Sequence, residues 1–522
     1  MKPPGVDTWL IPDGVTVEQV VQAVASGFTL AAAPEYAATV VYADSFDWRL
    51  YQRGYILHCH ARVWTLYHGD DSGEVTVQQG GPRLQGACMA QDFPPGDLQA
   101  ILTPLLGCRC LLPVATVRLA GRQIRLLNSD DKTVARLVIE EQQPTGKGPR
   151  YQLIRLFALR GYDDEAHRVQ RLLEANGVTA TVSPLLGFEE GCRAAGRRPL
   201  DYSGKFNVAL DHGMTARQAM VQIYSHLLAT MEHNIPGMLS DWDSEFLHDF
   251  RVAIRRTRSG LSLVKQVLPE ATINRFKRDF GVLGSLTGPT RDLDVYLLMR
   301  EDYLARLPEP LREGLQAFFA DMALRRQVEQ AKLVKALQSK KIQAILAAWK
   351  RYLQKTADRR PAPKAALAIA ELAGRIIMRR YKRVIKDGRA LNAGTPAEAV
   401  HRLRIQGKKL RYAIEFFSSL FPEKEIQHVV RQLKGLQDIL GSFNDLAVQQ
   451  QVVQDSLASL ASLAPQKPAS LATAAALGAL LQSLSTKQLA LRTHFAETFA
   501  QFSGEENTAF FYTLFAPKQD EA

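Results

Sequence analysis

The chain has 522 residues, with 65 Lys and Arg against 53 Asp and Glu, and a formal net charge of +12. This length is too great for one ordinary hydrophobic core, so two or more domains are expected. The sequence has no apolar run long enough to cross a membrane, and its start lacks the order of a signal peptide. We therefore expect a cytoplasmic protein without a membrane partner. Its cysteines show no paired C-x-x-C spacing, which favours reduced thiols over a disulfide framework or a zinc site.

The positive charge belongs to the C-terminal part of the chain. Residues 205–510 hold 44 Lys and Arg against 29 Asp and Glu, a net charge of +15, while the remainder carries a net charge of −3. A polyanionic partner is therefore expected to bind the C-terminal part.

Residues 1–200 alternate short apolar segments with turn residues, a pattern typical of strands. The predicted strands are ATVVYADS, EVTVQQ, ATVRLAGRQIRLL and TVARLVIEE. One helix is predicted over DDEAHRVQRLLEANG, with a stop at Gly177. These elements predict an α+β domain over residues 1–200. The pattern is lost around Gly191 to Lys205, which we interpret as a linker.

From about residue 207 the sequence predicts helices nearly everywhere, because long amphipathic runs are separated by Gly and Pro. One of these helices carries His248, Arg251, Arg255 and Arg258 at spacings of three, four and three residues. This spacing keeps all four side chains on one helical face, beside an ordinary apolar stripe. A lone basic stripe of this kind is usually a solvated surface.

The basic stripe is duplicated 153 residues further along the chain. HDFRVAIRRTR from His248 aligns with HRLRIQGKKLR from His401, and Asp292 aligns with Asp445 further on. The aligned cationic pairs are His248/His401, Arg251/Arg404, Arg255/Lys408, Arg256/Lys409 and Arg258/Arg411. A solvated face has no reason to keep this geometry twice, so we predict a binding function. The two copies span about 207–357 and 360–510, and 511–522 form a tail.

Four polyanions are candidates for this stripe: DNA, RNA, anionic lipid and inorganic polyphosphate. Arg and Lys side chains suit phosphate oxygens, but Tyr412 is the only stacking ring in the two basic helices. Base-edge readers are also scarce there, with Gln406 as the example. The apolar stripe is needed for a helical core and is unavailable to a membrane. A ligand made of phosphate alone therefore fits best, while a general polyanion or nucleic-acid binder stays the alternative.

Both copies carry H-x-x-R-[VI]-x-x-[RK]-[RK]-x-R with a downstream Asp-Leu, and residues 207–510 resemble the CHAD family. The resemblance implies an all-α domain, here residues 201–510, of two four-helix halves related by a pseudo-two-fold axis. It also implies inorganic polyphosphate binding in a basic channel and association with polyphosphate granules. The channel residues implied by position are His248, Arg251, Arg255, Arg258, His401, Arg404, Lys408 and Arg411. The predicted rim contacts are Arg256, Lys409, Arg379, Arg383 and Lys386, the last three from the basic segment GRIIMRRYKRVIK.

Two further expectations concern the groups around this channel. Asp292 and Asp445 would repel phosphate, so we expect them to fix an arginine or to cap a helix. The two histidines are either satisfied core groups or become protonated when a polyanion binds. Other polyanions, inositol polyphosphates among them, stay open as competitors for the channel.

The N-terminal half resembles the CYTH family, a β-tunnel fold that includes triphosphatases. The resemblance rests on YADSFDWRLYQRGYILHCHARV, NSDDKTVARLVIEE and LRGYDDEAHRVQRLLEANG. Triphosphatase activity in that family implies an E-x-E-x-K strand that holds a divalent metal ion. Here Glu18 stands alone near the N-terminus, and His58 and His60 replace the arginines expected in the hairpin, leaving Arg62.

The remaining site residues of this half are Arg136, Glu140 and Glu141. Two acids from one strand cannot complete a metal site, so we predict a degenerate CYTH-like domain with no catalytic residue, metal or cofactor. Its expected roles are to position the C-terminal domain or to contact a partner protein. The rival hypothesis is a metal-dependent triphosphatase that uses a rearranged site.

Overall fold

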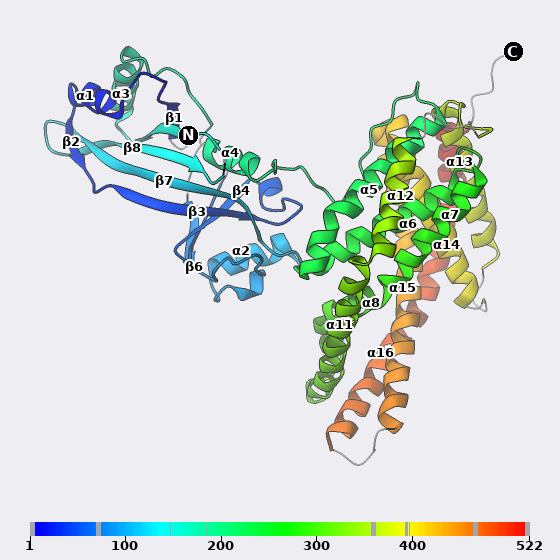
Figure 1. Cartoon of the computed structure of the whole chain (residues 1–522). Coiled ribbons are helices and arrows are strands. Elements are labelled where there is room, and N and C mark those ends of the chain that lie inside the picture. Colours follow the sequence, from blue (N-terminus) through cyan, green and yellow to red (C-terminus); the bar gives the residue numbers. More distant parts are fainter. Residues whose placement is uncertain are drawn as a thin grey trace. The chain divides into compact units, whose positions relative to one another are not determined.

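The structure is a computed structural model. It describes residues 6–68, 75–146, 148–183, 185–355, 362–391, 395, 397–462 and 468–516. The chain divides into two compact units, Met1–Gly204 and Lys205–Ala522. Figure 1 shows that strands build the first unit and that helices build the second. This confirms the predicted α+β and all-α fold classes of the two halves.

The first unit contains one antiparallel sheet. Its described strands are β1 (Val6–Leu10), β2 (Thr29–Ala32), β3 (Tyr36–Asp44), β4 (Tyr55–His60), β5 (Val63–His68), β6 (Val75–Gly80), β7 (Leu112–Leu127), β8 (Thr133–Pro144) and β9 (Tyr151–Ala158). Their order is β1-β9-β8-β7-β3-β4-β5-β6, and β2 pairs with β7. Each described pair is antiparallel, so all four predicted strand segments lie in this one sheet.

Four helices cover this sheet. They are α1 (Val17–Ala25), α2 (Asp97–Leu106), α3 (Asp163–Ala175) and α4 (Leu186–Ala194). Helices α1 and α3 share one buried cluster with β7, β8 and β9, and α2 shares another with β4 and β5. The predicted stop of α3 is present, because Gly177 follows the helix with a positive φ of 85°.

Helix α4 lies where we had predicted the start of a linker. Phe188 and Cys192 are buried in a cluster with Tyr42 and Val117, on strands β3 and β7. A Cβ atom at Gly191 would lie 2.9 Å from the Cβ of Ala115, so the glycine permits the close approach. The linker prediction is wrong for this stretch because apolar residues at helical spacing bury α4 against the sheet.

The second unit consists of two consecutive sets of helices. The first set is α5 (Ala216–Ser240), α6 (Ser244–Leu263), α7 (Glu270–Leu286), α8 (Gly288–Leu298), α9 (Arg300–Ala305), α10 (Glu309–Arg312), α11 (Gln316–Leu337) and α12 (Lys340–Gln354). The second set is α13 (Ile369–Arg389), α14 (Ala397–Phe417), α15 (Glu423–Ser462), α16 (Pro468–Phe502) and α17 (Glu505–Phe515). Helices α13, α14 and α15 begin 153 residues after α5, α6 and α7, the offset of the sequence repeat. The predicted tail 511–522 begins inside α17, and residues 517–522 lie outside the described part.

The two repeats differ at the helix that follows the basic one. The second repeat has the continuous helix α15, whereas the first repeat has α7 and α8, separated at Thr287. Pro289 stands at the start of α8 and lacks the N–H that a continuous helix would need there. Its counterpart in α15 is Ser442, which keeps that donor.

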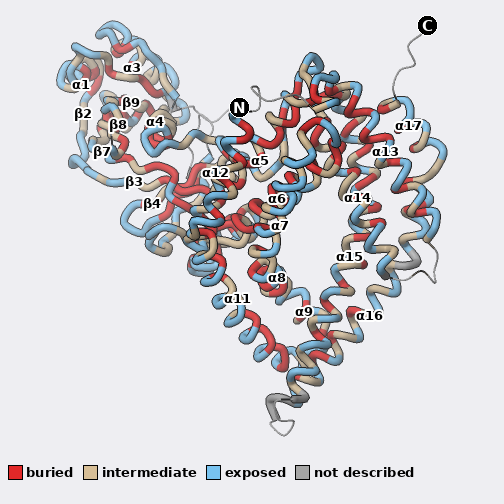
Figure 2. Tube along the Cα trace, turned by 45° about the vertical axis from the view of Figure 1, so that its right-hand side comes forward, coloured by how far each residue is buried: buried red, intermediate tan, exposed pale blue. Residues whose placement is uncertain are grey.

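The repeats share a hydrophobic cluster. Leu293, Tyr296 and Phe319 of the first repeat pack in it with Leu446 and Leu477 of the second. Figure 2 shows buried residues along one side of the long helices and exposed residues along the other, as expected for amphipathic helices. None of the described helices is both long and apolar enough to cross a membrane.

Candidate anion-binding site

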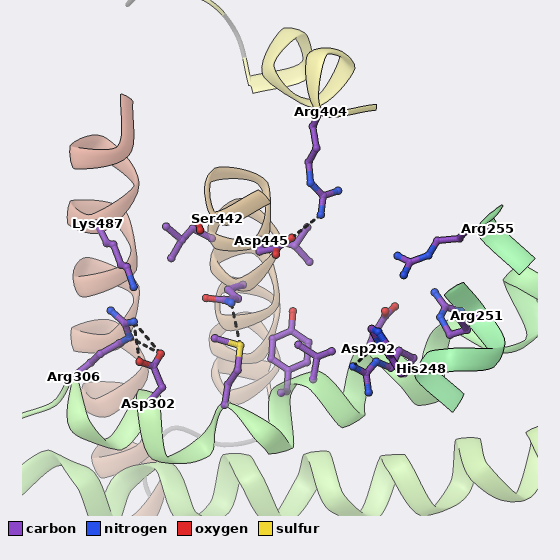
Figure 3. A pocket seen from close by; sticks show the side chains of 17 residues that line it. His248, Arg251, Arg255, Asp292, Asp302, Arg306, Arg404, Ser442, Asp445 and Lys487 are labelled. Carbon is purple, nitrogen blue, oxygen red and sulfur yellow. Dashed lines mark hydrogen bonds and ion pairs between the residues drawn. The ribbon is translucent and has the colours of Figure 1, made fainter. Parts of the chain in front are cut away.

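A pocket of about 610 Å³ lies between the two repeats. It is lined by six Arg and Lys side chains and three Asp side chains, so its charge is predominantly positive. The lining residues are His248, Arg251 and Arg255 of α6, Arg291, Asp292, Val295 and Tyr296 of α8, Met299, Asp302 and Arg306 around α9, Arg404 of α14, Ser442, Asp445, Leu446, Val448 and Gln449 of α15, and Lys487 of α16. Figure 3 shows the α6 residues at one end of the pocket and Lys487 with Arg306 at the other.

Helix α6 holds its cations through contacts with α7 and α8. Arg251 donates from Nη1 to the Gly284 carbonyl at 3.0 Å and to Thr287 Oγ1 at 2.9 Å. Partial burial lowers the pKa of Arg251, while the charge of Asp292 opposes this effect. The guanidinium is therefore fixed in direction, yet no carboxylate of the described residues accepts a hydrogen bond from it.

The two histidines make equivalent contacts with opposite proton roles. His248 Nδ1 lies 3.0 Å from Arg291 Nη2, and His401 Nδ1 bonds to Asn444 Oδ1; both partners are 43 residues downstream. Because a guanidinium only donates, His248 Nδ1 accepts that hydrogen bond. Because an amide oxygen only accepts, His401 Nδ1 donates. Adding a proton to His248 would therefore break its bond to Arg291, whereas His401 keeps its bond when protonated.

The two repeated aspartates lie beside the two repeated arginines. Arg404 Nη2 donates to Asp445 Oδ1 at 3.0 Å, and Asp292 interacts electrostatically with Arg251. Burial raises the pKa of Asp292, and the charges of Arg251 and Arg291 oppose the rise. This is the geometry expected of residues that orient an arginine.

Lys408, a predicted channel residue, lies one helical turn beyond Arg404 and does not itself line the pocket. Partial burial and the charges of Arg404 and Arg255 lower its pKa to about 8, with Asp445 as the opposing acid. Arg255 is the residue that corresponds to Lys408 in the first repeat. The two basic helices therefore bring equivalent cations together across the boundary between the repeats.

Some predicted contacts lie elsewhere. Arg256 donates from Nε and Nη2 to Glu415 Oε2 at 3.2 and 2.9 Å, so an acid of α14 already neutralises it. Lys409 interacts with Arg380 and Lys277, and burial lowers its pKa. Neither residue lines the pocket. Arg256 follows the pocket residue Arg255 by one position and is therefore rotated about 100° away from it around α6.

The predicted rim residues of α13 also have contacts outside the pocket. Arg379 Nη2 donates to the Leu263 carbonyl at 3.4 Å, and Arg383 pairs with Asp387 at 2.9 Å. Lys386 is exposed. His401, Arg258 and Arg411 follow the same helical faces as the pocket residues without lining the cavity itself.

Sequence reasoning missed three cations of the pocket: Arg291, Arg306 and Lys487. Arg291 directly precedes Asp292 in the sequence. Its counterpart in the second repeat is the uncharged Asn444, so Arg291 is not part of the repeated charge pattern. Arg306 and Lys487 correspond to Ser459 and Val334, which carry no charge. Arg306 donates from Nε and Nη2 to the two carboxylate oxygens of Asp302, whereas Lys487 is exposed.

The acids of the N-terminal sheet are already engaged. Tyr36 donates to Glu140 Oε2 at 2.6 Å, Arg155 pairs with Glu140 Oε1 at 3.2 Å, and Gln142 donates to the same oxygen. Glu141 points to the other face of β8 and pairs with Arg150 at 3.6 Å. Two neighbouring strand residues on opposite faces cannot ligate one metal ion.

The other groups of this half give no metal ligand set. Burial, with the charges of His60 and Arg155, lowers the pKa of His58 to about 4. Among the described residues, no group of three or more His, Cys, Asp or Glu is arranged to hold a metal ion. A triphosphatase site of the expected metal-dependent type therefore does not fit the residues present on this sheet.

The duplicated helices and their shared cationic pocket define an internally repeated, all-α type of domain. Residues 222–454 match the model of the CHAD domain family, and this part of the chain is a CHAD domain. The resemblance to the CHAD family that rested on the duplicated His-Arg pattern is thereby confirmed.

Solved structures similar to this chain include two that cover its C-terminal half. The CHAD domain from the plant Ricinus communis is 26% identical, covers 56% of this chain and 95% of its own, and has a TM-score of 0.47. PptA from Streptomyces chartreusis is 16% identical, covers 55% of this chain and 99% of its own, and has a TM-score of 0.44.

The N-terminal half is similar to a putative adenylyl cyclase from Hippeastrum, described as having a dominant triphosphatase activity. That protein is 12% identical, covers 38% of this chain and 98% of its own, and has a TM-score of 0.28. A comparison with curated proteins gave no match.

Proposed function

We propose that the CHAD domain binds inorganic polyphosphate in the pocket between its repeats, and that it does so without catalysis. The observation that carries this proposal is the pocket lining, which combines Arg251 and Arg255 of the first repeat with Arg404 of the second. Holding these like charges near one another costs free energy in the empty protein. Burial, with the charges of Arg404 and Arg255, also lowers the pKa of Lys408, one helical turn beyond Arg404. A polyanion that lies across both repeats removes this cost, because each cation then gains a phosphate oxygen.

The lining favours a chain of phosphates over a nucleic acid. Tyr296 is the one aromatic residue among the lining residues, and its side chain is buried in the cluster shared by the repeats. It is therefore unavailable for stacking on a base. The pocket instead offers guanidinium groups of fixed direction, such as Arg251 and Arg404, which suit phosphate oxygens.

The proposal is tested by calorimetric titration of the full chain with long-chain polyphosphate and with single-stranded DNA of matched charge, at one salt concentration. We expect tight binding of polyphosphate and much weaker binding of DNA. The variant Arg251→Ala/Arg404→Ala is expected to lose at least tenfold in affinity. Arg325→Ala/Lys332→Ala removes the same charge from exposed positions of α11 and serves as the control. Equal affinities for both polymers would contradict the proposal and favour a general polyanion or nucleic-acid binder.

The site also has a consequence for localisation. We propose that polyphosphate binding directs the protein to polyphosphate granules in the cell. A fluorescent fusion of the full chain should gather at granules, and the Arg251→Ala/Arg404→Ala variant should be dispersed. If the variant still gathers at granules, another part of the chain provides the targeting.

For the N-terminal unit we propose a non-catalytic role. The carboxylate of Glu140 already accepts hydrogen bonds from Tyr36 and Gln142 and pairs with Arg155, so it is not free to bind a metal ion. Full-length protein incubated with tripolyphosphate and Mg²⁺ or Mn²⁺ should release no phosphate above background. Release that disappears in Glu140→Ala/Glu141→Ala would establish the rival triphosphatase hypothesis.

A further inference from the structure

Glu415 joins the two repeats beside the cationic pocket. Its Oε2 accepts hydrogen bonds from Arg256 of α6, and its Oε1 accepts one from Arg411 Nε at 2.6 Å. The carboxylate side chain is 17% exposed, and that of Arg256 is 13% exposed, so the contact is largely shielded from solvent. One acid thus neutralises a cation from each repeat.

Arg411 belongs to the cationic face that enters the pocket. It follows Arg404 and Lys408 on one face of α14, and its charge contributes to the lowered pKa of Lys408. Arg404 itself lines the pocket. A phosphate chain that extends along α14 from Arg404 would therefore pass Lys408 and then meet Arg411, which Glu415 now holds.

The first repeat has no such acid. The residue that corresponds to Glu415 is Ser262, whose hydroxyl donates to the Arg258 carbonyl at 2.9 Å. Arg258, the counterpart of Arg411, is exposed and makes no ion pair with a described acid. The duplicated face therefore ends in an unpaired arginine in one repeat and in a paired arginine in the other.

We propose that Glu415 is a selectivity residue that acts as a built-in competitor for phosphate: it holds Arg411 until a long phosphate chain displaces it. This inference rests on the proposed polyphosphate function and adds to it. Short chains are expected to bind Arg251, Arg255 and Arg404 and to leave Glu415 in place. Long chains gain Arg411 only after they break its bond to Glu415, so their affinity is held below the value that the cations alone would give.

The variant Glu415→Gln tests this role because it removes the charge while keeping an oxygen that accepts hydrogen bonds from Arg256. We expect its affinity for long-chain polyphosphate to rise about threefold to tenfold. The slope of log K against log salt concentration should steepen by about 0.7, the effect of one more phosphate contact on a flexible single strand. The affinity for tripolyphosphate should change by less than twofold.

Two further variants supply the controls. Glu329→Gln makes the same charge change on α11, where the acid pairs with Lys332, and should leave both affinity and slope unchanged. Ser262→Glu introduces the acid at the equivalent position of the first repeat, one turn beyond Arg258. It should weaken the binding of long chains and make the slope shallower by about 0.7.

The outcomes separate the two proposals. If the wild-type chain binds no polyphosphate, the proposed function fails. If the wild-type chain binds and both Glu415→Gln and Ser262→Glu leave affinity and slope unchanged, the inference about Glu415 is wrong and the proposed function stands. A Glu415→Gln variant that unfolds leaves Ser262→Glu, at a partly exposed position, as the deciding measurement.

Discussion

The charge of Arg255 repels Lys408, the residue that occupies the same position in the other repeat. Partial burial, with the charges of Arg404 and Arg255, lowers the pKa of Lys408 to about 8. The internal duplication thus sets like charges of the two repeats against each other at this position. Two predictions about these basic helices, one about the contact between the repeats and one about the N-terminal sheet follow from specific interactions.

The affinity for polyphosphate should depend on pH through the protonation of Lys408. A bound polyanion favours the charged ammonium group, so binding raises the pKa of Lys408 and takes up protons near pH 8. Affinity for polyphosphate should therefore fall severalfold from pH 7 to pH 9. Lys408→Arg keeps its charge over this range and should flatten the fall, as titrations at both pH values would show. An unchanged fall in Lys408→Arg would assign the effect to another group.

The two histidines should carry their protons on different ring nitrogens. His401 donates from Nδ1 to Asn444, whereas His248 accepts at Nδ1 from Arg291. Nitrogen-15 NMR of the imidazole rings should therefore find the proton of neutral His401 on Nδ1 and that of neutral His248 on Nε2. The reverse result would contradict the assigned proton positions.

The ion pair between Arg256 and Glu415 should stabilise the contact between the repeats. Arg256→Met keeps much of the side-chain volume but removes both hydrogen bonds to Glu415 and the contact of the guanidinium with the Phe206 ring. Hydrogen bonds to charged groups contribute about 1.5–3 kcal/mol, and we expect a loss of this size in the free energy of unfolding. Denaturant unfolding of the full chain, with Arg325→Met as an exposed control, would measure it.

Packing of α4 on the N-terminal sheet should depend on Gly191. A methyl group there would lie 2.9 Å from Ala115 Cβ and 3.0 Å from Val117 Cγ2, closer than side chains normally pack. Gly191→Ala should therefore destabilise the first unit by about 1–3 kcal/mol, the usual cost of overpacking. Polyphosphate affinity should stay the same, since the pocket lies in the other unit. Limited proteolysis would locate the destabilised region.

The sequence was sufficient to predict the two units, the helical repeat and the face that carries His248, Arg251, Arg255 and Arg404. Helical periodicity and the 153-residue offset contain this information directly. It was insufficient for Arg256, because an acid 159 residues away neutralises that side chain and no local pattern predicts such a pairing.

Residues without a repeated counterpart were also beyond prediction. Arg291 and Lys487 line the pocket because α8 and α16 form part of its wall. This arrangement depends on how the helices pack, and no repeated pattern in the sequence predicts it. Likewise, the linker predicted from Gly191 begins inside α4, where Cys192 is buried with Phe188 against the sheet. Tertiary packing decides these positions, and periodicity does not report it.

The hydrophobic cluster shared by the repeats has a consequence for how the C-terminal unit folds. Leu293 and Tyr296 of the first repeat are buried in it together with Leu446 and Leu477 of the second. Neither copy of the ancestral helical unit completes this shared core alone, so the duplicated copies have become an obligate pair. Chains cut after residue 357 should remain only partly structured, and the two halves should gain their full order together, as one cooperative transition.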